Sequence, residues 1–310
     1  MLRSELIATF VLIVESGSLN RAAIRLGLSR SVISDRLAGL ESDLGTKLVT
    51  RSTHGLSLTA AGESFLDHAR GLLAGMEAAR NAVAEAGGSV SGRIRVAAPP
   101  ILFGEWLMPL VASFLRKHPL VHVEVSASDR TTDIVQDGYD LAIRSARHPD
   151  SALLARKLTT GRRIVVCSPG YRDRRGVPAS LSDLGEHEFV VYRNRRVMQD
   201  WTFRTQKGIR SARIEGRFAA DDAAVLRRSA LEGLGISLMP TFVAAQDLLR
   251  GDLVRVDLGV EPDTDAISAV YPKSNASLPR LKAFVRHLKD GLGDPPEWDR
   301  QLADAGIIAI

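Results

Sequence analysis

The chain has 310 residues, 45% of them apolar and 25% charged, with a formal net charge of +5 and one cysteine. This composition suits about two globular domains and excludes a disordered chain, and a single cysteine excludes an intramolecular disulfide framework and a multi-cysteine metal site. The apolar runs are short and interrupted by charges, so we expect a soluble cytoplasmic protein without a membrane span or signal peptide.

The opening of the chain predicts three short helices separated by glycines. The first helix is expected to stop at Gly17, and Ser18 is placed to cap the second. Gly27 supplies the positive φ of a tight turn, after which Ser29 can cap the third helix. Helices joined in this way form a helix-turn-helix, whose last helix can enter the major groove of DNA.

Polar side chains at the start of the third helix form the predicted reading face, since arginine pairs with guanine and hydroxyls contact bases or phosphates. Residues 47–59 then predict a strand, a turn and a strand, which make a wing beside that helix. The wing is expected to reach phosphates or the minor groove. The candidate DNA-binding residues are Ser18, Arg21, Ser29, Arg30, Ser31, Ser34, Asp35, Arg36, Arg51 and His54.

The local charge of this segment is modest, because residues 1–59 hold seven Lys or Arg against five Asp or Glu. An alternative interpretation is a small helical domain with a hairpin and no ligand. The caps, the turn and the wing all agree with a DNA-binding domain, so we favour that interpretation.

Residues 60–88 predict one long helix, because apolar residues recur every three or four positions from Phe65 to Val83. We expect this helix to pack against the same helix of a second copy, so that two recognition helices read a pseudo-palindromic site. The alternative is that the helix folds back on its own chain.

The chain resembles LysR-type transcriptional regulators in SLNRAAIRLGLSRSVISDRLAGLESDLGTKLVTR and LSLTAAGESFLDHARGLL. The similarity continues through GRIRVAAPPILFGEWLMPLVASFLRKHP, DGYDLAIR, CSPGYRDRRGVPASLSDL and ALEGLGISLMP, and covers about the first 290 residues. The resemblance implies a winged helix-turn-helix over 1–59, a dimerising linker helix over 60–88 and an α/β effector-binding domain similar to periplasmic solute-binding proteins. It also implies a dimer or a dimer of dimers.

The chain departs from the usual family pattern in its recognition helix. Arg30 and Ser31 stand where family members usually carry Gln and Pro, and Asp35 stands where a basic residue is common. An aromatic residue usual at Val49 is also missing. Asp35 would repel a phosphate and is better suited to accept a hydrogen bond from cytosine or to orient a nearby arginine.

The rest of the chain, read independently, predicts an α/β domain over 89–290, since strand-like runs such as RIRVAA and RIVVCS alternate with helical stretches. Such alternation favours mostly parallel sheets. The resemblance implies two subdomains, 89–162 with 266–290 and 163–265. The remainder, 291–310, is expected to be a flexible tail. The predicted helices cover residues 103–117, 131–137, 221–233, 241–249 and 278–289.

Small ligands of α/β sheets bind beyond the carboxyl ends of strands, which places the effector pocket in the loops after the predicted strands. Many family members carry a Ser or Thr after the first of these strands, but AAPPILF offers two prolines and therefore an apolar wall. The candidate ligand-binding residues are Pro99, Pro100, Ile101, Ser128, Arg144, Arg193 and Asp221.

A basic segment covers residues 193–217, which hold eight Lys or Arg and two acidic residues. Three interpretations are open: an ordinary solvated face, a surface for bent DNA or a neighbouring subunit, and a site for an anionic effector.

No catalytic or metal-binding arrangement is recognised, and no cofactor is expected. His118 and His122 cannot share a helical face because Pro119 lies between them. Cys167 lies in an apolar run and is expected to be a buried small residue rather than a redox sensor. Phosphate-loop, nucleophile-elbow and zinc-protease motifs are missing from the sequence.

We therefore predict a sequence-specific transcriptional regulator of the LysR type, not an enzyme, whose DNA binding responds to a small-molecule effector. Its expected partners are double-stranded DNA, the effector, further copies of the chain and RNA polymerase, with no membrane. The alternative is a cytoplasmic small-molecule-binding module whose N-terminal part only dimerises. An enzyme on a doubly wound fold explains least.

Overall fold

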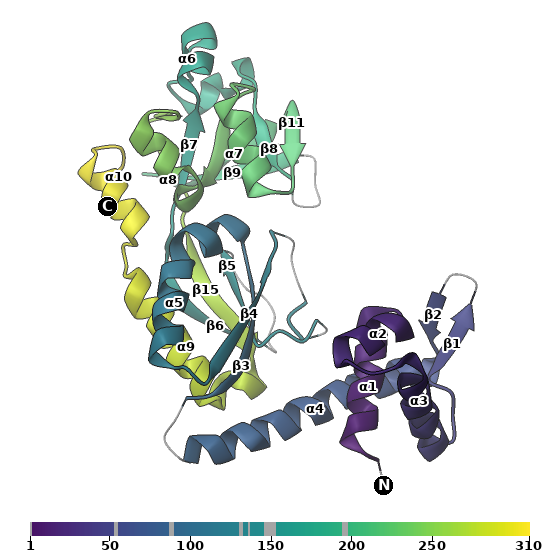
Figure 1. The fold of residues 1–310 in the computed structure, drawn as a ribbon. Helices are drawn as coiled ribbons and strands as arrows, with labels where there is room; N and C mark the ends of the chain where they lie inside the picture. Colours follow the sequence, from purple (N-terminus) through teal and green to yellow (C-terminus); the bar gives the residue numbers. More distant parts are fainter. Residues whose placement is uncertain are drawn as a thin grey trace. The chain divides into compact units, whose positions relative to one another are not determined.

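The computed structural model describes residues 2–52, 55–86, 90–129, 133–135, 137–145, 153–193 and 198–310. The chain divides into two compact units, residues 1–89 and 90–310 (Figure 1). In the described part of the chain, no helix has both the length and the apolar character needed to cross a bilayer.

The first unit contains a helical core, a two-stranded wing and a long helix. Its elements are α1 (Ser4–Ser16), α2 (Leu19–Leu26), α3 (Arg30–Leu44), β1 (Val49–Ser52), β2 (Gly55–Leu58) and α4 (Ala60–Ala86).

Side-chain caps and a left-handed glycine set the helix-turn-helix geometry. The Ser18 hydroxyl accepts a hydrogen bond from the Asn20 amide at 3.2 Å, and the Ser29 hydroxyl accepts one from the Val32 amide at 3.4 Å. Gly27 between α2 and α3 has a φ of 64°, which favours glycine. The predicted caps and turn are confirmed, and the helices meet in one apolar core. Its members include Leu6, Phe10, Ile13, Ala22, Ile33, Leu40 and Ala69.

The wing is docked on the start of α4. The Thr59 hydroxyl donates a hydrogen bond to the Lys47 carbonyl at 2.7 Å and accepts one from the Gly62 amide at 3.0 Å. A Cβ atom on Gly62 would overlap the Leu48 carbonyl oxygen, so the close approach of wing and helix requires glycine at this position.

The two halves of α4 differ in their surroundings. Leu66 and Ala69 are buried in the core of the first unit, so this part of the helix packs on its own chain. Further along, Leu72 and Met76 are 51% and 50% exposed. Two exposed apolar side chains four residues apart are typical of a helix face that another molecule covers.

The second unit begins with a five-stranded sheet in the order β4-β3-β5-β15-β6, on which α5 and α9 pack side by side (Figure 1). This sheet and its helices form subdomain I. Its elements are β3 (Gly92–Ala98), the π-helical turn Leu102–Leu107, α5 (Met108–Lys117), β4 (Val121–Ala127), β5 (Leu141–Ser145), β6 (Leu153–Gly161), β15 (Asp265–Pro272), the 3-10 turn Lys273–Ser277 and α9 (Pro279–Leu292).

Subdomain II carries three small sheets, in the orders β12-β7-β13, β11-β8 and β10-β9-β14. Its elements are β7 (Arg163–Cys167), α6 (Pro169–Arg175), the 3-10 turn Leu181–Glu186, β8 (Val190–Tyr192), β9 (Met198–Thr205), β10 (Gly208–Glu215), β11 (Phe218–Ala220), α7 (Ala223–Leu231), β12 (Ser237–Pro240), α8 (Thr241–Arg250), β13 (Val254–Arg255) and β14 (Glu261–Pro262).

The sheets are mixed, so the prediction of mostly parallel sheets is wrong. Among the strands that the structure describes in this unit, β3 pairs in parallel with β4 and β5, and β8 pairs in parallel with β11. The other pairings between its named strands are antiparallel. The reason is that β15 returns to the first sheet antiparallel to its neighbours, while β9 and β10 form a local hairpin that was not predicted.

The predicted helix over 131–137 falls partly outside the described residues. Within the described positions 133–135 and 137–138, the chain forms turns and no helix. The helical signal of this short stretch was therefore misleading, and the turn ends at Gly138, whose φ is 67°.

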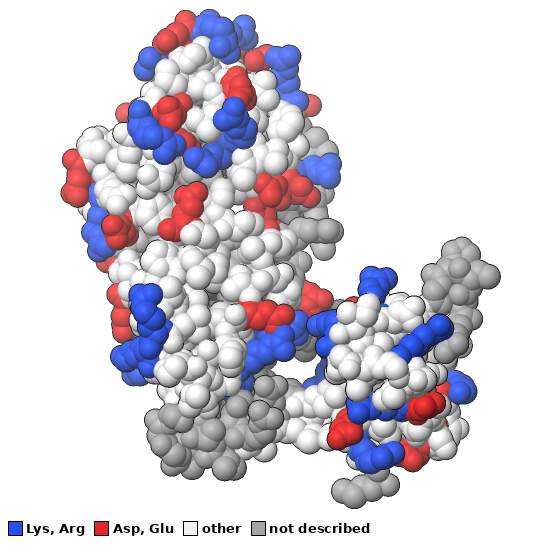
Figure 2. Space-filling model, in the orientation of Figure 1, with Lys and Arg blue, Asp and Glu red and all other residues white. Residues whose placement is uncertain are grey.

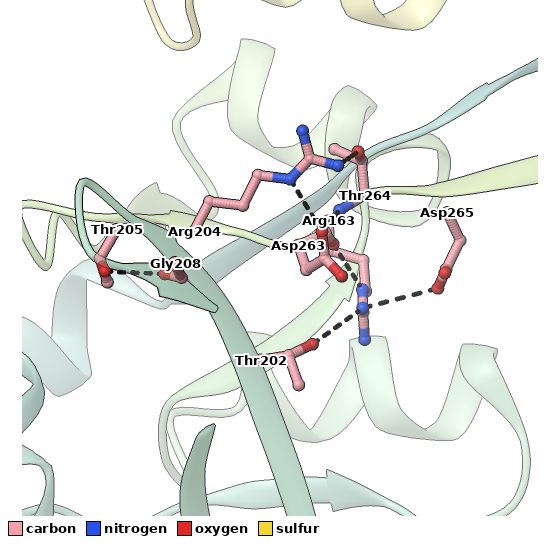
Figure 3. Close-up of polar contacts among 8 residues, drawn as sticks. All are labelled: Arg163, Thr202, Arg204, Thr205, Gly208, Asp263, Thr264 and Asp265. Atoms are coloured by element: carbon pink, nitrogen blue, oxygen red, sulfur yellow. Dashed lines mark hydrogen bonds and ion pairs between the residues drawn. The ribbon is translucent and has the colours of Figure 1, made fainter. Parts of the chain in front are cut away.

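The two chain crossings between the subdomains are tied together by a polar cluster (Figure 3). Arg163, the first residue after one crossing, donates from Nε to the Asp263 carbonyl at 3.2 Å and lies 3.5 Å from the Asp265 carboxylate. On the returning segment, Asp263 accepts a hydrogen bond of 2.8 Å from Arg204, which also donates to the Thr264 hydroxyl at 2.9 Å. The hinge cluster, defined as these five residues, therefore joins both crossings to β9.

The C-terminal residues are ordered, so the expectation of a flexible tail is wrong. Residues 297–304 form α10 (Glu297–Asp304), which packs on α8. Trp298 and Leu302, four residues apart, are 1% and 0% exposed and complete the apolar core of the second unit. The apolar stripe of this short helix explains why it docks.

Candidate DNA interface and effector-binding region

The first half of α3 exposes polar side chains that the fold does not use. Arg30 and Asp35 are exposed, and neither has a polar partner among the described residues. On the opposite side of the helix, Ile33, Leu37 and Leu40 are buried. The helix therefore has one face for the core and one free face that can contact another molecule. Figure 2 shows the charges of this unit as a mixture of both signs.

The candidate serines differ in their exposure and in the hydrogen bonds that their hydroxyls already form. Ser29 and Ser31 share a hydrogen bond of 2.8 Å between their hydroxyl oxygens, and Ser29 also caps α3. Ser18 caps α2 and is half-buried, and Ser34 is half-buried on α3. Only Ser31 combines an exposed hydroxyl with a position outside the caps, so it is the serine best placed for a contact.

Arg36 points to the core of its own unit instead of the free face. Its guanidinium donates to the Thr9 hydroxyl at 3.4 Å and lies 3.8 Å from the Glu5 carboxylate, both on α1. Arg21, by contrast, is exposed on α2. Arg36 therefore holds α1 and α3 together, whereas Arg21 and Arg30 remain available for a phosphate or a base.

The wing residues of the candidate set lie at the edge of the described residues. Arg51 belongs to β1, which pairs with β2 in an antiparallel register. Its side chain and the whole of His54 lie outside the described residues.

Glu41 is an important residue of this unit that the sequence did not reveal. Its carboxylate is 6% exposed and accepts hydrogen bonds from Lys47 Nζ at 2.6 Å and from the Leu48 amide at 3.0 Å. Burial by itself raises the pKa of Glu41, but the hydrogen bonds and the charge of Lys47 outweigh it and hold the pKa below its ordinary value. Glu41 therefore fixes the start of the wing against the end of α3.

In the second unit, the candidate pocket residues form two groups. One group lies at the ends of β3 and β4, where the Ser128 amide donates to the Ala98 carbonyl at 3.0 Å beside Pro99. The other group lies in subdomain II, where the Arg193 amide donates to the Ala220 carbonyl, next to Asp221. Pro100 and Ile101 lie in the helical turn after β3, and Ile101 packs partly against the core.

Asp129 joins these two groups by linking the end of β4 in subdomain I to the start of α7 in subdomain II. Its carboxylate accepts a hydrogen bond of 2.7 Å from the Ala223 amide at the start of α7. Its carbonyl accepts one of 3.3 Å from the Tyr192 hydroxyl. Asp129, Ala223 and Tyr192 were not among the predicted ligand-binding residues. Asp129 directly follows Ser128 at a strand end, which is the signal that could have found it.

This contact between the subdomains is electrostatically unusual because three acidic residues, Asp129, Asp221 and Asp222, interact there. Burial raises the pKa of Asp129, and repulsion from Asp222 and Asp221 adds to this, although the hydrogen bond from Ala223 works against it. Burial and the same acids raise the pKa of Tyr192 to about 12. On β5 of subdomain I, burial lowers the pKa of Arg144, which has a polar partner and is half-buried.

Cysteine and metal chemistry find no support in the described residues. Cys167 is completely buried in β7, and burial raises the pKa of its thiol to about 11, so a reactive thiolate is disfavoured. The described residues contain no group of three or more His, Cys, Asp or Glu side chains arranged to hold a metal ion.

Comparisons with known proteins assign both units. Residues 4–63 match the model of the bacterial regulatory helix-turn-helix protein, lysR family, and residues 87–293 match the LysR substrate binding domain. The transcriptional regulator PtxR of Pseudomonas aeruginosa is 35% identical over 289 residues, which cover 93% of this chain and 92% of PtxR.

Solved structures agree with this assignment over more than nine-tenths of the chain. The LysR-type transcriptional regulator CrgA of Neisseria meningitidis is 30% identical with a TM-score of 0.60, covering 94% of this chain and 100% of CrgA. The full-length virulence activator AphB of Vibrio cholerae is 27% identical with a TM-score of 0.60, covering 93% of this chain and 98% of AphB.

A free face on the third helix of a winged helix-turn-helix and a two-subdomain α/β unit are thus found together in one chain that matches both family models. The protein belongs to the LysR family of transcriptional regulators, with an N-terminal helix-turn-helix DNA-binding domain and a C-terminal effector-binding domain.

Proposed function

We propose that this regulator binds a pseudo-palindromic promoter site through paired α3 helices and that a small molecule bound between the two subdomains of the effector-binding unit changes this binding. The observation that carries the proposal is the free face of α3. Arg30 and Asp35 are exposed and unpartnered among the described residues, while Arg36 is committed to α1. A guanidinium at this position can donate two hydrogen bonds to guanine, and a carboxylate can accept one from cytosine.

The proposed assembly is a dimer through α4, or a dimer of such dimers. Leu72 and Met76 support it, because each leaves about half of its surface exposed on a helix that extends from the DNA-binding core. One recognition helix covers few base pairs, and two related by a two-fold axis read a longer palindromic site. RNA polymerase is the further partner that a promoter-bound regulator would meet.

The effector is proposed to act where Asp129 bridges the subdomains. A molecule that inserts between the end of β4 and the start of α7 has to replace the bond from the Ala223 amide, so it alters the angle between the subdomains. In a dimer this change can alter the spacing of the recognition helices and hence the bend of the DNA.

The proposal is tested by selecting genomic fragments with the purified full-length protein at near-physiological salt, then footprinting the selected fragments. We expect a protected pseudo-palindrome. Arg30→Ala is expected to weaken operator binding by roughly 1–3 kcal/mol and to relax the preference at one base pair, because a bidentate base contact is lost. Thermal stability should be unchanged, since Arg30 holds no other group in the described residues.

Arg156→Ala is the matched control. Arg156 is exposed on β6 of the second unit, so this change removes the same charge without touching α3. The control should bind the operator like the unmodified protein. If no fragment is enriched over random DNA, a small-molecule-binding module whose N-terminal part only dimerises becomes the better description.

A further inference from the structure

A concave surface lies in the effector-binding unit beside the two chain crossings between the subdomains. The hairpin groove, about 1070 Å³ in volume, lies between the β9–β10 hairpin, the segment 257–262 and residues 308–309. A smaller concavity of about 530 Å³ continues along the hairpin and shares Arg210, Leu181 and Ser182 with it. The groove is lined by six Lys or Arg residues and by two acidic ones. The basic residues are Arg162, Arg163, Arg204, Lys207, Arg210 and Arg255, and the acidic residues are Asp257 and Glu261.

Most of these positive charges are neutralised by the fold. Each of four arginines has a carboxylate partner within 3.5 Å, so these arginines contribute little free charge. The pairs are Arg162 with Asp299, Arg163 with Asp265, Arg204 with Asp263, and Arg255 with Glu261.

Lys207 and Arg210 are the exceptions. Neither side chain has a polar partner among the described residues, and both line the groove. Arg210 is the cross-strand partner of Phe203, which is buried, so both side chains lie on the inner face of the hairpin. Arg210 is itself exposed within this concave surface, so a dissolved anion can reach its guanidinium. An unpaired arginine and lysine that line one groove favour a ligand over a merely solvated charge.

The described part of the basic segment therefore holds fewer unpaired charges than its composition indicated. Within residues 198–217, Arg204 and Arg217 are paired with Asp263 and Glu188, and Arg213 also has a polar partner. The unbalanced charge of this stretch is therefore concentrated at Lys207 and Arg210, at and beside the turn of the hairpin.

We propose that the hairpin groove is a second ligand site, separate from the effector site proposed at Asp129, which takes a small anion carrying two or more negative charges through Lys207 and Arg210. Charge-assisted hydrogen bonds from a guanidinium and an ammonium suit a phosphate or clustered carboxylates. Leu258, Val260 and Ile308 add an apolar wall that suits the carbon skeleton of an organic anion.

The position of the groove gives this anion access to the hinge. Arg163, Arg204 and Thr264 line the groove and also belong to the hinge cluster. A polyvalent anion in the groove competes with Asp263 and Asp265 for the two arginines. Occupancy of the groove is therefore expected to alter the hydrogen bonding of the crossings, and with it the angle between the subdomains.

The test is calorimetric titration of the full-length protein with inorganic phosphate and, separately, with citrate, with sodium chloride at matched ionic strength as the baseline. We expect saturable binding with a dissociation constant below about 1 mM for at least one anion. Lys207→Gln and Arg210→Gln should each weaken it roughly tenfold, since each removes a charged hydrogen-bond donor. Arg156→Gln, which removes an exposed charge on β6, should have no effect. The relative affinities for phosphate and citrate distinguish phosphorylated from polycarboxylate ligands.

Hydrogen exchange provides a second readout. In wild type, the saturating anion should change the exchange of residues 161–163 and 263–265, and this change should disappear in the Lys207→Gln/Arg210→Gln double variant.

Binding no stronger than that of chloride, or binding unchanged in the double variant, would overturn the proposal. So would a loss of operator affinity in the double variant in anion-free buffer, since the groove would then be a DNA surface. Operator selection with Arg30→Ala is scored independently. The proposals for DNA binding by α3 and for an effector at Asp129 can therefore stand if this one fails.

Discussion

The Asp129 carboxylate accepts a hydrogen bond of 2.7 Å from the Ala223 amide, which joins the end of β4 in one subdomain to the start of α7 in the other. The bond places an acidic group at the N-terminus of a helix, where backbone amides favour a negative charge. The neighbouring Asp221 and Asp222 oppose that charge. The ionisation of Asp129 and the strength of this contact between the subdomains are therefore linked.

Asp129→Asn is expected to change the pH dependence of stability. The pKa of Asp129 is raised in the folded protein, so the folded chain binds this proton more tightly than the unfolded chain does. The associated stability is present in acid and is lost as the pH rises through the folded pKa. The free energy of unfolding of the variant relative to wild type should thus improve from about pH 4 to pH 7.

Urea denaturation of both proteins across this pH range measures the difference, in which the titration of all other groups cancels. A difference that stays constant with pH would show that Asp129 does not titrate in this window. Asp304→Asn, which removes an exposed carboxylate at the end of α10, is the matched control for the loss of one negative charge.

Glu41→Gln is expected to destabilise the DNA-binding unit. The carboxylate receives hydrogen bonds from Lys47 and the Leu48 amide, and their loss or weakening should cost about 1–3 kcal/mol at neutral pH. Because the pKa of Glu41 is lowered in the folded state, this stability is present above the unfolded pKa and is lost as the pH falls through the folded pKa. The difference from wild type should therefore shrink in acid.

Chemical denaturation followed by circular dichroism measures this effect, with Asp43→Asn as the matched control on the same helix. Asp43 is exposed and its variant should behave like wild type. An equal loss of stability in both variants would mean that helix charge, and not the buried wing contact, is responsible.

Gly62→Ala is expected to separate the wing from α4. The added Cβ overlaps the Leu48 carbonyl oxygen, which is backbone and cannot rotate away, so the loop or the helix start has to move. We expect a loss of about 1–3 kcal/mol in unfolding free energy and weaker operator binding.

Gly39→Ala in the same unit is the control for this change. A Cβ there meets only Leu6 Cδ1 at an ordinary 3.8 Å, and alanine is the better helix former by roughly 0.5–1 kcal/mol. The melting temperature should thus fall for Gly62→Ala and rise for Gly39→Ala. If both substitutions raise it, the wing is not held against α4 as described.

Leu302→Ala should destabilise the effector-binding unit by about 2–5 kcal/mol, as expected for a fully buried leucine. The side chain lies on α10 in the main core of that unit. Scanning calorimetry of the full chain, with the exposed Asp304→Ala as the comparison, measures the loss. Melting like wild type would mean that α10 contributes nothing to the core.

Local signals in the sequence were sufficient for the DNA-binding unit. Ser18, Gly27 and Ser29 act on neighbouring backbone atoms, and the apolar spacing of α1 and α3 selects their buried faces, so the caps, the turn and the exposed face of α3 could be recognised without a structure. Arg36 shows the limit of such reasoning. It belonged to the same predicted set as Arg30, but the packing of α1 beside α3 brings its guanidinium to Thr9.

In the effector-binding unit, the strand patterns revealed an α/β domain but not how its strands pair. The β9–β10 hairpin alternates buried Trp201 and Phe203 with polar residues, a pattern that the dense positive charge of this segment concealed. The tail likewise carried Trp298 and Leu302 at helical spacing, but a stripe of two residues becomes meaningful only when α8 offers a surface to cover it.

The sequence by itself determined the helix-turn-helix, the long linker helix and the alternating elements of the effector domain, because these depend on interactions between residues close in the chain. The tertiary structure decided the Asp129–Ala223 bridge and the hinge cluster around Arg163 and Asp263, whose partners lie about a hundred residues apart. Such contacts depend on how whole sheets and helices pack, which no local pattern encodes.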